Sequence, residues 1–369
     1  MRAKETLTRL LRAADIEVNG NRPWDFQAHD ERVFRRIIRH GSLGAGESYM
    51  DGWWSSEQAD ELFHRLLRAR LEQSFRHAPA TVLNTLLALL FNGAWLRPFQ
   101  VGKAHYDVGN DLFRRMLDRR MTYTCGYWKS VTSLDQAQEA KLDLVCRKLG
   151  VREGDYILDI GSGWGSFINF AAERYGARCL GITVSREQAQ YANAHRYNAE
   201  VETRLMDYRA VDGRFDHVVS LGMFEHVGRK NYRRFLRKVR SVLADDGLFL
   251  LHTIGKDRSA AATDPWIAKY IFPNSMIPSC RQVTGAAEQL FVLEDWHNFG
   301  ADYDTTLMHW RRNFDAAWDD LRQRYDERFY RMWTYYLAVS AGSFRARRSN
   351  LWQIVLSKHG VPGGYRRVD

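Results

Sequence analysis

The segment Ile157-Leu-Asp-Ile-Gly-Ser-Gly-Trp-Gly165 constrains the fold of this chain more than any other. It is a short apolar run that ends in an acidic residue and continues into three glycines at alternate positions. Glycines let the backbone turn tightly and let a ligand approach it closely. We therefore expect a buried strand over 156–160, a ligand-binding turn after it, and a helix over 167–175.

The pattern of a strand followed by a helix repeats towards the C-terminus. Apolar runs predict strands over 178–183, 202–206, 215–221 and 248–252, and helical spacing predicts helices over 134–149, 186–198 and 231–243. Such alternation is typical of an α/β fold with a mostly parallel sheet and helices on both faces. The run 351–356 predicts a last edge strand. The aromatic-rich residues 256–345 break the alternation and predict a substrate-binding insertion.

The N-terminal part has a different character. Apolar residues at helical spacing predict short helices over 1–75, with a glycine-rich turn at Gly41–Trp54 that lacks the strand–helix context of a phosphate loop. We expect a helical domain over 1–80, a linker over 81–100 and a larger domain over 101–369. The apolar run 82–96 is too short and too interrupted to predict a membrane span. Its segment 82–91 is either an inter-domain helix or an interfacial helix that rests on lipid.

Charge and cysteine usage limit the partners. The net charge of +10 favours anionic partners, and residues 1–90 are nearly neutral, so the excess lies further along the chain. No nucleic-acid-binding module or basic–aromatic repeat is present, so we expect no nucleic-acid partner. The four cysteines form no C-x-x-C pair, so neither a metal site nor a disulfide framework is expected. The charged N-terminus has no apolar leader region, which predicts a cytoplasmic protein.

Part of this basic excess lies at residues 229–240, which contain seven basic residues and no acid. Tyr232, Phe235, Leu236 and Val239 form an apolar stripe along the same stretch. This basic amphipathic helix is either an outer helix of the sheet or a contact for anionic lipid.

The spacing of the glycine motif argues against a dinucleotide cofactor. A dinucleotide fingerprint needs its third glycine one residue later and an acid at the end of the second strand, where this chain has Thr183. The motif instead looks like the first motif of S-adenosylmethionine-dependent methyltransferases, in which the loop holds the methionine part of the cofactor. Hydroxyl and amide groups of Thr183, Ser185 and Gln188 could hold the ribose, and Asp207 could accept from the adenine amino group. The alternative is a structural glycine turn in another doubly wound protein.

Several further motifs are more specific. They are GSLGAGESYMDGWW (41–54), VGKAHYDVGNDLFRRMLD (101–118), YTCGYW (123–128), GMFEHVG (222–228), LLHTIG (250–255), DPWIAKYIFPN (265–274) and EDWHNFGADYDTTLM (294–308). With the glycine loop, they make the chain resemble bacterial cyclopropane-fatty-acyl-phospholipid synthases, which are related to mycolic acid cyclopropane synthases. The resemblance implies a Rossmann-like class I methyltransferase domain with a small helical N-terminal domain that docks on lipid.

The resemblance also implies the chemistry. Members of this family transfer a methylene group from S-adenosylmethionine to the cis double bond of a phospholipid acyl chain, through a carbocation that a bound bicarbonate deprotonates. The bicarbonate cage of the family matches Cys125, Glu225, His252, Ile254 (through its backbone) and Tyr303. The expected cofactor-binding residues are Tyr106, Tyr123, Thr124, Asp159, Gly161, Gly163, Trp164, Gly165, Thr183, Ser185, Gln188, Asp207 and Tyr208.

Three positions depart from the family pattern. Ser162 and Ser166 replace a cysteine and a glycine of the loop, and both replacements are small. Ser340 stands where relatives can carry a cysteine, which argues against a cysteine nucleophile there.

The implied partners are unsaturated membrane phospholipids, the surface of the inner membrane and a second copy of the chain. Three rivals stay open: a methyl-branched or methylene lipid product, a small soluble substrate, and a lipid-binding protein without catalysis.

Overall fold

The computed structural model describes residues 2–70, 109–260 and 262–369, and these form two compact units. The helical unit comprises the described residues of 1–92, 261–273 and 303–349, and the sheet unit those of 93–260, 274–302 and 350–369. The apolar run 82–91 and the predicted linker over 81–100 lie outside the described residues. The domain boundaries expected from the sequence therefore stay a prediction.

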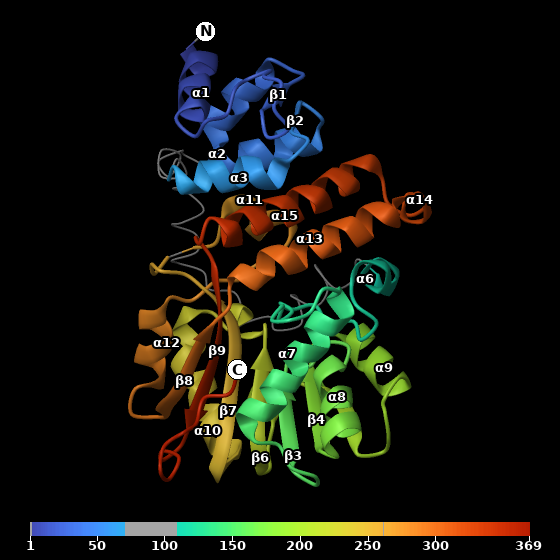
Figure 1. Ribbon diagram of the computed structural model, residues 1–369, viewed down its shortest axis with the longest axis vertical. Helices are drawn as coiled ribbons and strands as arrows, with labels where there is room; N and C mark the ends of the chain where they lie inside the picture. The colour runs from blue at the N-terminus through green and yellow to red at the C-terminus, as the bar shows by residue number, and fades with distance from the viewer. Residues whose placement is uncertain (1, 71–108, 261) are drawn as a thin grey trace. The chain divides into compact units, whose positions relative to one another are not determined.

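The helical unit is built from helices far apart in the sequence (Figure 1). Gly342 lets two of them approach closely, because a Cβ at this position would lie 2.7 Å from the carbonyl oxygen of Asp60. Trp54 fills the core beside them and stacks on Phe26. The elements are α1 (Arg2–Arg12), β1 (Gln27–Ala28), α2 (Arg32–Met50), β2 (Trp54–Ser55), α3 (Ala59–Arg68), α11 (Pro265–Tyr270), α13 (Ala301–Ala316, apart from its first two residues), α14 (Trp318–Leu321) and α15 (Glu327–Arg345).

The glycine-rich stretch 41–54 differs from its prediction as a turn. Helix α2 continues through it as far as Met50, and only Gly41 leaves the helical conformation, with φ of 58° and ψ of −134°. Glycine adopts this φ without a steric penalty, so the helix kinks at Gly41 and resumes. Gly46 lies on the resumed turn, where a Cβ would meet the indole of Trp266 at 2.3 Å. The glycines of this stretch therefore allow close packing within a helix.

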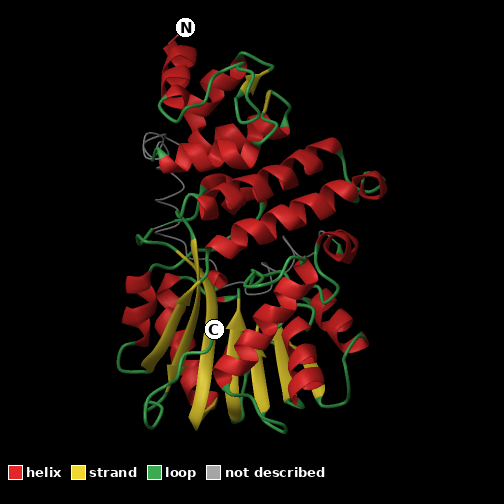
Figure 2. Ribbon diagram, viewed as in Figure 1, coloured by secondary structure: helices red, strands yellow, loops and turns green. Residues whose placement is uncertain are grey.

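The sheet unit contains one sheet, whose strands are yellow in Figure 2. It has seven strands in the order β5-β4-β3-β6-β7-β9-β8. The first five strands in this order are parallel to their neighbours, and β9 pairs antiparallel with both β7 and β8. The strands are β3 (Tyr156–Ile160), β4 (Arg178–Thr183), β5 (Val201–Leu205), β6 (Phe215–Leu221), β7 (Leu243–Gly255), β8 (Val292–Asn298) and β9 (Asn350–Ser357). The helices are α6 (Asn110–Met116), α7 (Leu134–Leu149), α8 (Ser166–Tyr175), α9 (Arg186–Ala194), α10 (Tyr232–Val242) and α12 (Cys280–Ala287), with 3₁₀ turns at Tyr208–Ala210, Phe224–His226 and Arg229–Asn231.

Helices cover both faces of this sheet. Buried side chains of α7 and α8 pack on one face, and those of α10 and α12 pack on the other. Figure 1 shows α7 and α8 in front of the strands. The stripe of Tyr232, Phe235, Leu236 and Val239 is wholly buried in the second layer. The basic helix is therefore an outer helix of the sheet, and the predicted α/β class is confirmed.

Two predictions about the end of the sheet need correction. The run 351–356 is a strand, but it lies between β7 and β8, so it is not at the edge. The edge strand on this side of the sheet is β8, Val292–Asn298, which falls inside the predicted insertion and was not expected as a strand. Four of its seven residues are polar, and all but His297 are exposed or half-buried, as an edge strand tolerates. Helix α9 also ends at Ala194, earlier than expected, and β7 is longer than predicted.

Candidate functional site

The glycine loop lies where β3 ends and α8 begins. The backbone N–H groups of Gly161 and Ser162 both donate to the carbonyl of Ile182 on β4, at 2.9 and 3.0 Å. Gly161 has a φ of +90°, and a Cβ on it would lie 2.6 Å from the Cβ of Met223. Both facts require glycine at this position, since other residues rarely adopt this φ. The loop is thus held tightly against the next strand.

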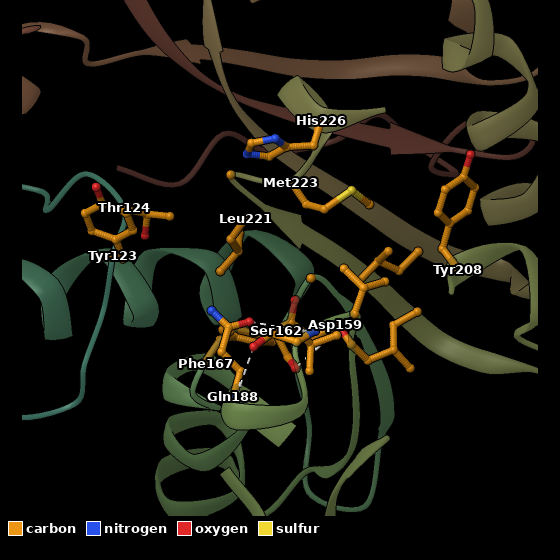
Figure 3. Close-up of a pocket in the computed structure, with 18 of the residues that line it drawn as sticks. Tyr123, Thr124, Asp159, Ser162, Phe167, Gln188, Tyr208, Leu221, Met223 and His226 are labelled. Carbon is orange, nitrogen blue, oxygen red and sulfur yellow. Dashed lines mark hydrogen bonds between the residues drawn. The ribbon is translucent and has the colours of Figure 1, made fainter. Parts of the chain in front are cut away.

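A pocket opens above this loop at the carboxyl edge of the sheet, which is where ligands bind in open α/β sheets. Figure 3 shows Tyr123 and Thr124 at one side of the pocket, Tyr208 at the opposite side, and Asp159 and Ser162 between them. The sequence-predicted cofactor residues in its lining are Tyr123, Thr124, Asp159, Gly161, Gly163, Trp164, Thr183, Ser185, Gln188, Asp207 and Tyr208. Gly165 is not among the lining residues and directly precedes α8. Tyr106 lies outside the described residues.

The residues predicted to face the ribose form a connected, buried network. Thr183 Oγ1 donates to Gln188 Oε1 at 2.8 Å and accepts from the backbone N–H of Ser185 at 3.2 Å. The Ser185 side chain in turn accepts from the N–H of Gln188 and caps α9. The Asp207 carboxylate is engaged by Arg209, whose Nε lies 2.7 Å away. Any ligand that binds Asp207 therefore contacts a carboxylate that is already paired with Arg209.

Two charged groups in the pocket wall are fully buried. Burial raises the pKa of Asp159, at the end of β3, to about 7. Its Oδ1 atom has no hydrogen-bond partner among the described residues. Lys141 comes from α7 and was not singled out from the sequence. A signal was present, because Lys141 shares the helical spacing of Leu134, Ala137 and Val145, which are also buried.

Other pocket residues escaped the sequence analysis as well. Met223 and His226 follow β6 and line the same pocket, where Met223 packs directly against Gly161 of the loop (Figure 3). Burial lowers the pKa of His226 to about 4, so this imidazole is neutral at neutral pH. Nothing local in the sequence distinguishes these residues from core residues of a 3₁₀ turn.

The residues predicted to surround the base are distributed over both units. Cys125, Glu225, His252 and Ile254 belong to the sheet unit, whereas Tyr303 belongs to the helical unit, where its ring packs on Phe344. Glu225 follows β6 and its Oε1 accepts from the backbone N–H of Ile254 on β7, at 2.6 Å. The backbone N–H of Ile254, which the resemblance predicts to hold the bicarbonate, is thus bonded to Glu225. The Cys125 thiol is buried and donates to the carbonyl of Gly126.

Two polar atoms of this group are left with unused capacity. Within the described part of the chain, neither Glu225 Oε2 nor His252 Nε2 has a hydrogen-bond partner, and both atoms are buried. His252 Nδ1 lies 3.4 Å from the side-chain amide nitrogen of Gln353, which can only donate. Burial holds the pKa of His252 well below its usual range, so the ring is neutral and carries its proton on Nε2. His252 Nε2 is therefore a donor available to a ligand, and Glu225 Oε2 accepts when this carboxyl is ionised and donates when it is protonated.

The raised pKa of Glu225 should make the stability of the folded protein depend on pH. Burial raises the pKa of Glu225 to about 7, although the hydrogen bond from Ile254 opposes this shift. An unfolded glutamate has a pKa of about 4.3, so the folded protein holds an extra proton between these values. The stabilisation is complete below the unfolded pKa and is lost as the pH rises through 7. We expect the stability advantage of Glu225→Gln over the unsubstituted protein to grow by about 2.5 kcal/mol between pH 5 and pH 8.

Urea unfolding of both proteins at the two pH values measures this difference. Asp159 also titrates in this range, but it is present in both proteins and cancels in the comparison. An advantage that stays constant with pH would contradict the buried, proton-binding state of Glu225.

Comparison with known proteins places this site in a family. The model of the mycolic acid cyclopropane synthetase family matches residues 96–354. The chain is 48% identical to cyclopropane-fatty-acyl-phospholipid synthase of Escherichia coli, over 97% of this chain and 94% of that protein. It is 34% identical to tuberculostearic acid methyltransferase UfaA1 of Mycobacterium tuberculosis, over 90% of this chain and 82% of that protein.

Solved structures agree with the sequence comparison. The mycolic acid cyclopropane synthase CmaA1, crystallised with SAH and CTAB, has a TM-score of 0.66 and 30% identity over 70% of this chain and 98% of its own. SAH is S-adenosylhomocysteine, the product that S-adenosylmethionine becomes after it gives up its methyl carbon. The chain therefore belongs to the cyclopropane synthetase family, and it is an S-adenosylmethionine-dependent enzyme of the methyltransferase class, homologous to cyclopropane-fatty-acyl-phospholipid synthase.

Proposed function

We propose that this enzyme transfers a methylene group from S-adenosylmethionine to the cis double bond of an unsaturated acyl chain in a membrane phospholipid. The products are a cyclopropane acyl chain, S-adenosylhomocysteine and one proton. The similarity to cyclopropane-fatty-acyl-phospholipid synthase over nearly the whole chain supports this substrate class. The observation that carries the reaction type is the pair of buried atoms Glu225 Oε2 and His252 Nε2, which bond to none of the described residues.

The chemistry requires such a pair. The alkene attacks the sulfonium methyl carbon, so a C–C bond forms, the C–S bond breaks and a carbocation remains on the chain. The ring closes only when the added methyl group loses a proton to a base. Methyl transfer to nitrogen or oxygen forms no second bond to that carbon, so only cyclopropanation needs a base that reaches the transferred methyl group. The buried Glu225 and His252 are our candidates for holding that base.

A small oxyanion that carries a proton is the ligand that we assign to these two atoms. Bicarbonate, when bound, would supply the base that removes the methyl proton. The neutral His252 would donate from Nε2 to an anionic oxygen, and Glu225 Oε2 would accept from a hydroxyl. Glu225 is in turn held by the N–H of Ile254. Roles for Cys125, Ile254 and Tyr303 in such a cage stay predictions from the resemblance.

Transfer of label into lipid tests the substrate class. We would incubate the purified protein with S-adenosylmethionine labelled in its methyl group and with phospholipid vesicles that carry cis-unsaturated chains. Matched vesicles with saturated chains are the control. We expect label only in the unsaturated lipid. Absence of label from lipid, with S-adenosylhomocysteine still bound by the protein, would favour a small soluble substrate instead.

A methyl-branched product is the second candidate. The 34% identity to a tuberculostearic acid methyltransferase favours it specifically, because that name denotes a methyltransferase of a fatty acid. Both reactions put label into unsaturated lipid, and only the structure of the product separates them.

Docking on the membrane is a further part of the proposal. No helix in the described ranges is long and apolar enough to cross a bilayer. The exposed side of α10 and the turn before it presents Arg229, Lys230, Arg234 and Arg237. Arg233 differs from these, because its guanidinium donates to the carbonyl of Glu288 at 2.8 Å and so holds α12. We propose that the four exposed residues contact anionic headgroups. A homodimer stays a prediction.

Charge reversal on this face tests the contact. Arg234→Glu/Arg237→Glu should lower binding to anionic vesicles about 10-fold or more at low salt, because each basic residue near the surface contributes about 1 kcal/mol. The difference should shrink as salt screens the charges. Arg186→Glu/Arg196→Glu makes the same change in net charge at exposed positions on and just after α9. Equal co-sedimentation of the two double variants would count against α10 as the docking face.

A further inference from the structure

Lys141 is a buried cation in the wall of the cofactor pocket. It lies on α7 and its side chain is wholly excluded from solvent. It lines the pocket together with Thr124 and Asp159. An ammonium in such a position costs free energy unless opposite charge and hydrogen bonds compensate it. None of the residue roles proposed above involves Lys141.

The hydrogen bonds of this ammonium are only partly used. Lys141 Nζ donates to Thr124 Oγ1 at 2.8 Å, and an ammonium has three donors. Asp159 compensates it electrostatically, yet Asp159 Oδ1 accepts from no described residue. The pocket therefore presents a cation and a carboxylate, both buried, that retain capacity for a ligand.

The methionine end of S-adenosylmethionine has complementary groups. Its α-carboxylate and α-ammonium sit on the same carbon atom, so a recognising site needs one cation and one anion close together. The other cationic side chain in the wall, Arg209, is engaged with Asp207 through Nε and Nη2. His226 is neutral at neutral pH.

We propose that Lys141 receives the α-carboxylate of the cofactor while Asp159 receives its α-ammonium. Thr124 orients the lysine by accepting one of its protons. The inference rests on the cofactor of the proposed function and not on its lipid substrate. Lys141 is therefore a residue that determines affinity for the amino-acid end of the cofactor.

The charge state is compatible with this role. Burial lowers the pKa of Lys141 to about 8, and the nearby carboxylates of Asp118 and Asp159 oppose that shift. The ammonium form is therefore the main form at neutral pH. A carboxylate from the ligand would stabilise it further, and the ammonium of the ligand would favour the ionised form of Asp159, whose pKa burial raises to about 7.

Another anion is the competing assignment. Lys141 also acts electrostatically on His252 and Cys125, which belong to the predicted base site. Neither of these residues lines the cofactor pocket, whereas both Thr124 and Asp159 do. The position of the ammonium thus favours the cofactor over a bound base, and the experiment separates the two.

Calorimetric titration of the full chain without lipid tests the assignment. The two ligands are S-adenosylhomocysteine and its decarboxylated analogue, which lacks only the α-carboxylate. Lys141→Met should weaken S-adenosylhomocysteine about 30-fold, because a buried charge-assisted hydrogen bond is lost. The same variant should change affinity for the decarboxylated analogue by less than about threefold, since that ligand never engages the ammonium.

Two more variants keep the test decisive. Lys148→Met removes another buried lysine of α7, which contacts His297 at 3.0 Å and does not line the pocket. It should leave the ratio of the two affinities unchanged. Thr124→Val keeps Lys141 but removes the oxygen that orients it, and should weaken S-adenosylhomocysteine about threefold to tenfold with little effect on the analogue.

Three outcomes would overturn the assignment. Equal losses for both ligands in Lys141→Met would mean that the lysine only supports the fold. Unchanged affinities with lost turnover would mean that it serves another anion. If Lys141→Met does not fold, unchanged binding of both ligands by Thr124→Val would contradict the proposal on its own. The proposed lipid reaction could fail without affecting any of these readouts.

Discussion

Glu225→Gln is expected to lower turnover about 1,000-fold at saturating cofactor, since a positioned acid–base group contributes rate factors of this order. The substitution keeps the shape of the side chain and leaves an oxygen to accept from Ile254. It replaces Oε2, which can accept when the carboxyl is ionised, with an amide nitrogen that can only donate. A protonated oxyanion would then lose the group that orients it. Affinity for S-adenosylhomocysteine should stay within about threefold, because Glu225 does not line the cofactor pocket.

Glu294→Gln is the matched control for this change. Glu294 Oε1 accepts from Ser357 at 2.6 Å and from the N–H of Val361 at 2.9 Å, and an amide oxygen keeps both bonds. Its turnover should equal that of the unsubstituted protein. Steady-state rates with unsaturated vesicles measure both variants. Full turnover by Glu225→Gln would remove this residue from the chemistry.

Gly161→Ala is expected to weaken binding of S-adenosylhomocysteine about 100-fold, through backbone strain and displacement of the loop. The residue has a φ of +90°, and the added Cβ would lie 2.6 Å from the Cβ and 2.8 Å from the Cγ of Met223. Relief of this contact must move either the loop or Met223, and both line the pocket.

Gly154→Ala is the control that separates backbone strain from displacement of the glycine loop. Gly154 has a similar φ of +85°, and a Cβ there would have no heavy atom within 4 Å. This variant should lose a similar amount of stability from the strained backbone and yet bind S-adenosylhomocysteine normally. Calorimetric titration of both variants gives the comparison. Affinities that differ by less than about threefold would contradict the loop as the cofactor cradle.

The parallel half of the sheet could be predicted from sequence because its signals are local. Strands β3, β4 and β6 begin and end where apolar runs and flanking glycines place them. The glycine loop carries its own context, a strand before it and a helix after it. The buried stripe of α10 likewise follows from helical spacing alone.

Other features depend on contacts between distant segments. Whether a strand lies at an edge is decided by its partners, so β9 could not be placed between β7 and the polar strand β8. Gly41 kinks α2 without ending it, because the helix resumes where Gly46 packs against Trp266 from far along the chain. The helical spacing of Lys141 indicates that it is buried, but only the fold brings Thr124 and Asp159 beside it.

The product formed from ¹³C-methyl-labelled S-adenosylmethionine tests the central claim most directly. Proton–carbon correlation NMR of the recovered phospholipid shows which carbon environment received the label. We expect a labelled ring methylene bonded to two adjacent chain carbons, with one of the three methyl protons lost. A labelled methyl branch that retains all three protons, or a labelled exocyclic alkene carbon, would contradict it.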